Sequence, residues 1–281
     1  MRFEPPTYAT LPTVAEMVRA MDRRVTGLES TKLRLSLTLR RFMVAAALGH
    51  PRPPQNVMVI GPSGSGKTHG LRELLDAIPV MWTDIDATSF SDVGYVGRDL
   101  ASAYLGLLQP RWRGHHGDDP RPWTVQETVS LAERWGVLVI DEFDKLRANS
   151  KPKEGERQVG RALQAELLKL VEGVEVLCKR HDDDRGTFIR TGNILHIAVG
   201  AFQGLNDVVM RDLDIAIERD HAYTHTSVHN VIDYGFLEEL VGRFSTIVTL
   251  PPLNGGHLAA IFREQSLTLP HRNAAERCGG I

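Results

Sequence analysis

The sequence predicts an α/β domain built on a parallel sheet, and three observations carry that prediction. A Gly-rich segment at 61–68 directly follows a strand-like run at 56–60, of which the last four residues are apolar. A second apolar run, at 137–140, ends in two adjacent carboxylates. Further strand-like runs are separated by stretches long enough for helical crossovers, which is typical of a parallel sheet. With 281 residues, 42% of them hydrophobic, the chain can bury the core of one large domain plus small appendages.

The individual elements follow from hydrophobic spacing. Apolar residues at helical spacing predict helices at 14–21 and 30–48, and prolines at 51, 53 and 54 end the second. The segment after the Gly-rich turn has a core-facing helical stripe made of Leu71, Leu74, Leu75 and Ile78. Strands are expected at 56–60, 80–85, 137–140, 194–199 and 246–250, and 110–123 has the composition of a surface loop. We therefore expect three layers around a five-stranded parallel sheet.

The segment 61–68 is a complete phosphate-binding loop (P-loop). Its residues are Gly61, Pro62, Ser63, Gly64, Ser65, Gly66, Lys67 and Thr68. The glycines let backbone N–H groups turn toward phosphate oxygens, Lys67 can reach the β- and γ-phosphates, and the Thr68 hydroxyl can ligate Mg²⁺. A plain Gly/Ser-rich turn is the alternative, but the flanking strand and helix favour the functional interpretation. The sequence predicts ATP and Mg²⁺ as cofactors.

The carboxylates after the strand at 137–140 form a Walker B pattern, placed where open α/β sheets bind their ligands. Asp141 would hold Mg²⁺ through water, and Glu142 would orient and polarise the water that attacks the γ-phosphate. Two solvated loop acids are the alternative, and the upstream phosphate-binding loop weighs against it. We expect an ATPase.

Composition excludes several other classes. The net charge is −2 and the pI is near 6.6, so nucleic acid is not the default partner. Cys178 and Cys278 are too few for a disulfide framework or a four-cysteine zinc site. No apolar signal region or membrane-length run is present, so we expect a cytoplasmic protein. His221, His225 and His229 recur every four residues, but no carboxylate or cysteine pattern supports a metal site there.

Several ordered blocks between residues 25 and 253 resemble the AAA+ unfoldases ClpX and HslU of the Clp ATPase family. The blocks are Asp86-Ala87-Thr88, Gly94-Tyr95-Val96-Gly97, Ile140-Asp141-Glu142-Phe143-Asp144-Lys145, Leu167 to Gly173, Ile194-Leu195, Gly200-Ala201-Phe202, Gly235-Phe236-Leu237 and Val241-Gly242-Arg243-Phe244. The resemblance implies an AAA+ fold and a ring, expected to be a hexamer. It also implies that ATP hydrolysis drives unfolded or tagged protein substrates through the ring pore.

The resemblance also implies roles for particular residues. Tyr95 with Val96 matches the pore loop that grips the substrate, and a tight turn with a partly buried tyrosine is the alternative. Arg243 matches the arginine finger that reaches the neighbouring subunit's nucleotide, and a surface arginine at a helix C-terminus is the alternative. Val25 and Thr26 match the adenine contact, although the family's usual Ile-Gly-Gln is Thr-Gly-Leu here.

The resemblance divides the chain into a helical lead-in at 1–50, the AAA+ P-loop ATPase large domain at 51–253 and a short tail at 254–281, in place of a small domain. No counterpart of the peptidase-docking Ile-Gly-Phe loop lies between 206 and 233, and no zinc domain precedes residue 25, so a peptidase partner is unsupported. Ala198 and Val199 put no polar side chain at the sensor-1 region. The basic triplet 179–181 matches the entrance loop of ClpX in its spacing. The alternative is a solvated loop, because three aspartates follow the triplet directly.

These features predict an ATP-dependent protein unfoldase. The alternative is an ATP-binding regulatory or assembly subunit with little turnover. A DNA-remodelling motor is disfavoured by the acidic balance and by Tyr95, where a basic DNA-contacting loop would be expected.

Overall fold

The computed structural model describes residues 5–22, 25, 27–49, 54–90, 103–108, 124–148, 156–179, 185–213, 219–252, 255–256 and 259. Its centre is a five-stranded sheet in which every pair of neighbours is parallel. In spatial order the strands are β2 (Met81–Asp86), β3 (Gly136–Asp141), β6 (Leu195–Gly200), β1 (Val57–Ile60) and β7 (Thr246–Thr249). The α/β fold class and the five predicted strands are confirmed.

The three inner strands are largely apolar because both faces of the sheet are covered. Every residue of β1 and β6 is buried, as are the first five residues of β3. Near-continuous apolar runs are typical of parallel strands between two helical layers. Ile60 lies opposite Gly200, and Ile140 lies opposite Ala198, so the C-terminal ends of these strands meet at one edge.

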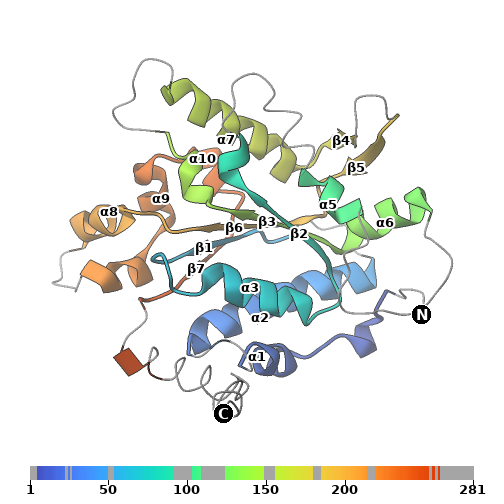
Figure 1. Ribbon diagram of the computed structural model, residues 1–281, viewed down its shortest axis with the longest axis horizontal. Helices are drawn as coiled ribbons and strands as arrows, with labels where there is room; N and C mark the ends of the chain where they lie inside the picture. The colour runs from blue at the N-terminus through green and yellow to red at the C-terminus, as the bar shows by residue number, and fades with distance from the viewer. Residues whose placement is uncertain are drawn as a thin grey trace, which may run out of the picture.

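Helices pack on both faces and make three layers (Figure 1). One face carries α1 (Val14–Asp22), α2 (Glu29–Leu48) and α3 (Lys67–Asp76), whose apolar side chains pack with Val57 and Val59. The other face carries α7 (Glu156–Glu172), α8 (Leu205–Asp212), α9 (Val228–Tyr234) and α10 (Glu238–Val241). Their core includes Met58 and Ile60. Successive side chains of β1 therefore point alternately into the two helical layers.

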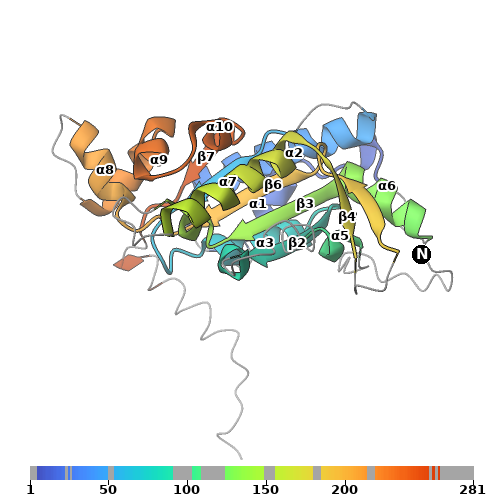
Figure 2. The ribbon, with the colours of Figure 1, turned by 90° about the horizontal axis from the view of Figure 1, so that it is seen from above.

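The helices predicted at 14–21 and 30–48 are confirmed, within one residue at each end. The hairpin of β4 (Glu175–Cys178) and β5 (Thr187–Arg190) was not predicted. Figure 2 shows this hairpin and α6 (Val125–Trp135) at one end of the molecule, with α8 and α9 at the other. The short elements are η1 (Tyr8–Thr10), η2 (Ala87–Phe90), α5 (Leu105–Leu108), η3 (Phe143–Leu146) and η4 (Arg219–His225).

The histidines spaced four apart do not share one helix. His221 and His225 belong to η4, whereas His229 lies in α9, which begins after its capping residue Ser227. Among the described residues, no group of three or more His, Cys, Asp or Glu side chains is arranged to hold a metal ion.

Within the same residues, no helix is both long enough and apolar enough to cross a lipid bilayer. The domain limits at 50 and 253 stay a prediction. The segment 110–123, which is expected to be a surface loop, lies outside the described residues, and the tail at 254–281 lies almost wholly outside them.

Candidate functional site

The glycines of the phosphate-binding loop serve two purposes. Gly64 and Gly66 have φ angles of 78° and 82°, and nothing lies within 4 Å of the position that a Cβ would take. These residues adopt the left-handed conformation that glycine allows, next to open space. Gly61 is instead tightly packed, because a Cβ there would lie 2.8 Å from Cβ of Leu250. The loop is therefore anchored at its start and open at its centre.

A cavity of about 240 Å³ lies over this loop, at the C-terminal edge of the sheet. Its lining residues are Ser63, Gly64, Gly66, Lys67, Thr68, His69, Asp141, Glu142, Gly200 and Ala201. The Thr68 hydroxyl is 3.3 Å from Oδ1 of Asp141, although the two residues are 73 positions apart in the chain. The fold thus brings the two predicted motifs together in one cavity.

Lys67 begins helix α3 and bends back over the loop. Its ammonium group donates hydrogen bonds of 2.7 Å to the carbonyl oxygens of Gly61 and Pro62. Burial lowers the pKa of Lys67, while the negative charges of nearby Asp141, Asp144 and Glu142 act in the opposite direction. A lysine ammonium has three protons, so one remains for a ligand in the cavity.

The two Walker B carboxylates have different environments. Asp141 is held by the Thr68 hydroxyl and by the backbone N–H of Glu142, which donates to its Oδ1 at 3.0 Å. Glu142 has a φ angle of 53°, and its side chain is about half exposed, with Oε2 3.9 Å from Nζ of Lys145. A non-glycine residue in the left-handed region is uncommon, and such residues concentrate at functional sites. Asp141 is therefore fixed, whereas Glu142 can face water in the cavity.

Three residues that line the cavity were not among the predicted site residues. They are His69 and the pair Gly200 and Ala201. Behind that pair lies Asp144, which is 3% exposed and whose Oδ1 accepts a hydrogen bond from the Ala201 N–H at 3.0 Å. A Cβ at position 200 would lie 2.7 Å from the same oxygen, so only glycine fits. The one signal in the sequence is the small Gly-Ala pair directly after an apolar strand. Ala198, at the position matched to the sensor-1 region, is completely buried in the strand predicted at 194–199.

Arg243 does not line the cavity. It follows α10, its side chain is 52% exposed, and its Nε lies 3.1 Å from Oε1 of Glu172 at the end of α7. Val25 is buried beside Gly70 and lines a gap of only about 10 Å³ near the phosphate-binding loop. That gap is far smaller than a purine. The contact between Val25 and the adenine base stays a prediction. Thr26, Tyr95 and Val96 lie outside the described residues.

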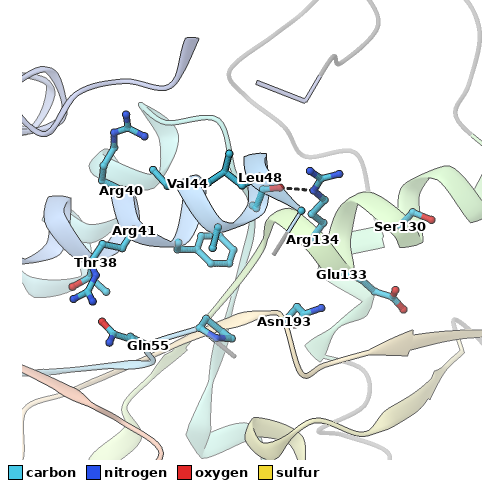
Figure 3. Close-up of a pocket in the computed structure, with 15 residues that line it drawn as sticks. Thr38, Arg40, Arg41, Val44, Leu48, Gln55, Ser130, Glu133, Arg134 and Asn193 are labelled. Atoms are coloured by element: carbon cyan, nitrogen blue, oxygen red, sulfur yellow. Dashed lines mark hydrogen bonds between the residues drawn. The ribbon is translucent and has the colours of Figure 1, made fainter. Parts of the chain in front are cut away.

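A larger cavity, of about 790 Å³, lies at the opposite edge of the sheet (Figure 3). It is lined by the second half of α2, by α6, and by Gln55 and Asn193, which precede β1 and β6. Arg134 reaches from α6 to the end of α2, where its Nε donates to the Ala46 carbonyl at 2.5 Å. This lining contains no residue of the phosphate-binding loop and neither Walker B carboxylate. The residues predicted to bind phosphate therefore line the smaller cavity.

Comparison with known proteins identifies the family. The family model described as AAA domain (Cdc48 subfamily) matches residues 52–247. Two relatives, each described as ATP-dependent Clp protease ATP-binding subunit ClpX, come from Bacteroides thetaiotaomicron and Azotobacter vinelandii. They are 27% and 30% identical to this chain over 90% of its length, and the matches span 63% and 61% of the relatives' own lengths. Because the family model covers well over half of the chain, the protein belongs to the AAA domain family and resembles ClpX within it.

Proposed function

We propose that this chain is an ATP-dependent protein unfoldase, which couples ATP hydrolysis in a ring to the threading of protein substrates. The observation that carries the proposal is the cavity in which Lys67, Thr68, Asp141 and Glu142 converge. The comparison adds relatives described as the ATP-binding subunit of an ATP-dependent protease, which favours proteins as substrates.

The residues of the cavity divide the work of hydrolysis. The N–H groups of the phosphate-binding loop and the third proton of Lys67 bind the phosphate oxygens. The Thr68 hydroxyl and the Asp141 carboxylate, 3.3 Å apart, offer the hard oxygen ligands that suit Mg²⁺. When bound, Mg²⁺ offsets the negative charge of the phosphates. Glu142, half exposed at the cavity, orients the attacking water and accepts its proton.

Two further residues act outside this cavity. Arg243 serves as the arginine finger for the neighbouring subunit, which explains an exposed guanidinium that is absent from its own cavity lining. Tyr95, with Val96, grips the substrate in the pore of a hexameric ring. One chain alone is then a poor ATPase, because every site depends on its neighbour.

The first test measures particle size and phosphate release of the purified chain with ATP and Mg²⁺. We expect ATP-dependent rings with turnover. Glu142→Gln should bind ATP without turnover, and Arg243→Ala should lower the rate by about 10³-fold or more. Mixing the two variants should restore turnover, because the first donates a finger and the second offers an intact site. A monomer that binds ATP and never hydrolyses it would instead support a regulatory subunit.

The second test separates hydrolysis from threading. Tyr95→Ala should leave ATP hydrolysis unchanged and abolish the unfolding of a tagged fluorescent protein, because the grip of the ring is lost. Tyr95→Phe is the matched control and should retain unfolding. Normal unfolding by Tyr95→Ala would remove Tyr95 from the pore-loop role.

A further inference from the structure

Asn56 is a buried amide at the start of the sheet. It directly precedes β1 and is 4% exposed. Its Oδ1 accepts a hydrogen bond from the His196 N–H at 2.9 Å, and its Nδ2 donates to the Arg243 carbonyl at 3.2 Å. A backbone N–H can only donate and a carbonyl can only accept, so one amide orientation satisfies both partners. Asn56 therefore links the strand before the phosphate-binding loop to the residue proposed as the arginine finger, 187 positions away.

The backbone around Arg243 is fixed on its other side as well. The next residue, Phe244, is 2% exposed, and its ring lies 5.5 Å, centroid to centroid, from the ring of Phe143 in an edge-to-face arrangement. Phe143 is completely buried and follows Glu142 directly. The Arg243 N–H donates to the Leu240 carbonyl at 3.1 Å. The base of the Arg243 side chain is thus held from two directions.

The tip of the same side chain is exposed. The guanidinium pairs with the Glu172 carboxylate, and both side chains are substantially exposed. Exposed pairs of this kind contribute little free energy, so Glu172 does not fix the guanidinium strongly. A fixed base and an exposed tip are what a group needs in order to act on a neighbouring subunit.

We infer that Asn56 is a positioning residue for the arginine finger. Through its hydrogen bond to the Arg243 carbonyl, it sets the point from which the guanidinium reaches the neighbour's nucleotide. The inference rests on the proposed function, in which Arg243 acts in trans. The competing explanation is purely structural, since Asn56 also joins β6 and accepts the Thr246 N–H on its own carbonyl at 3.4 Å.

Mixed rings distinguish the two explanations, because finger and active site then belong to different subunits. Donor subunits carry Glu142→Gln and contribute a finger without hydrolysing ATP. Acceptor subunits carry Arg243→Ala and contribute a site without a finger. Asn56→Asp is placed either in the donor subunits or in the acceptor subunits. The new carboxylate still accepts a hydrogen bond from the His196 N–H but cannot donate one to the Arg243 carbonyl.

Asn56→Asp in the donor should lower phosphate release of the mixed rings by about 10-fold or more, since a displacement of about 1 Å at a catalytic group can cost ~100-fold. The same change in the acceptor should leave the rate within about 2-fold. Asn56→Ala, which buries no charge, is run in parallel and should show the same donor-only loss. Turnover in the acceptor arm demonstrates that the variant subunit folds and binds ATP.

An equal loss in both arms, a loss of ring assembly in both arms, or no loss in the donor arm would overturn the inference in favour of a structural role. Failure of the proposed function is recognised separately. If donor and acceptor subunits with Asn56 intact show no turnover when mixed, Arg243 does not act in trans, and the inference is overturned with that function.

Discussion

We expect His196 to make the stability of the fold depend on pH. It lies in β6 and is completely buried, and its Nε2 is 2.8 Å from the hydroxyl of Tyr104, which is also completely buried. Burial disfavours the charged imidazolium and lowers the pKa of His196 to about 4. A histidine in the unfolded chain has a pKa of about 6.5. The native protein therefore keeps this side chain neutral at pH values where the unfolded chain takes up a proton.

The sign and size of the effect follow from these two pKa values. Below pH 6.5 the unfolded state binds one more proton than the native state, so the free energy of unfolding falls as the pH falls, until about pH 4. With pKa values of about 6.5 and about 4, His196 alone removes about 2 kcal/mol between pH 7 and pH 5. Such a loss is a large fraction of the stability of a typical domain.

The assay is urea unfolding at pH 7 and pH 5, followed by tryptophan fluorescence. The control is the double variant Tyr104→Phe/His196→Leu, which removes both polar partners and leaves neither one buried alone. Carboxylates contribute equally in both proteins and cancel in the comparison. The double variant should lose about 2 kcal/mol less than the original chain over this interval. An identical loss in both proteins would show that His196 is not held neutral by burial.

Three further changes have expected outcomes. Gly200→Ala places a Cβ 2.7 Å from Oδ1 of Asp144 and should weaken ATP binding, measured by calorimetry, by about 10-fold or more. Gly255→Ala is the control, because open space surrounds Gly255, and it should leave ATP affinity unchanged. Equal affinities of the two variants would contradict the packing argument. Arg134→Ala removes two hydrogen bonds to carbonyls at the end of α2 and should cost about 1–2 kcal/mol in thermal unfolding; an unchanged transition would show that this cap is dispensable. Chelating Mg²⁺ should abolish phosphate release reversibly, and persistent turnover would argue against the assigned metal ligands.

The inner strands could be predicted because each has a strong local pattern. A run such as 137–140 is apolar at every position, and only a strand covered on both faces needs that pattern. The β4–β5 hairpin has no such signal, since its residues alternate between buried and exposed over only four positions per strand. Short alternating strands are easily taken for loop, and the basic triplet that begins at Lys179 favoured that interpretation.

The sequence by itself determined the two motifs from which phosphate chemistry is predicted, because the loop at 61–68 and the carboxylates at 141 and 142 lie in short contiguous segments. Only the tertiary structure decided which distant residues meet them. The insertion of β6 between β1 and β3 brings Gly200 and Ala201 to the cavity, and the approach of β7 brings the Arg243 carbonyl to Asn56. Strand order is set by packing between segments far apart in the chain, and no local pattern encodes it.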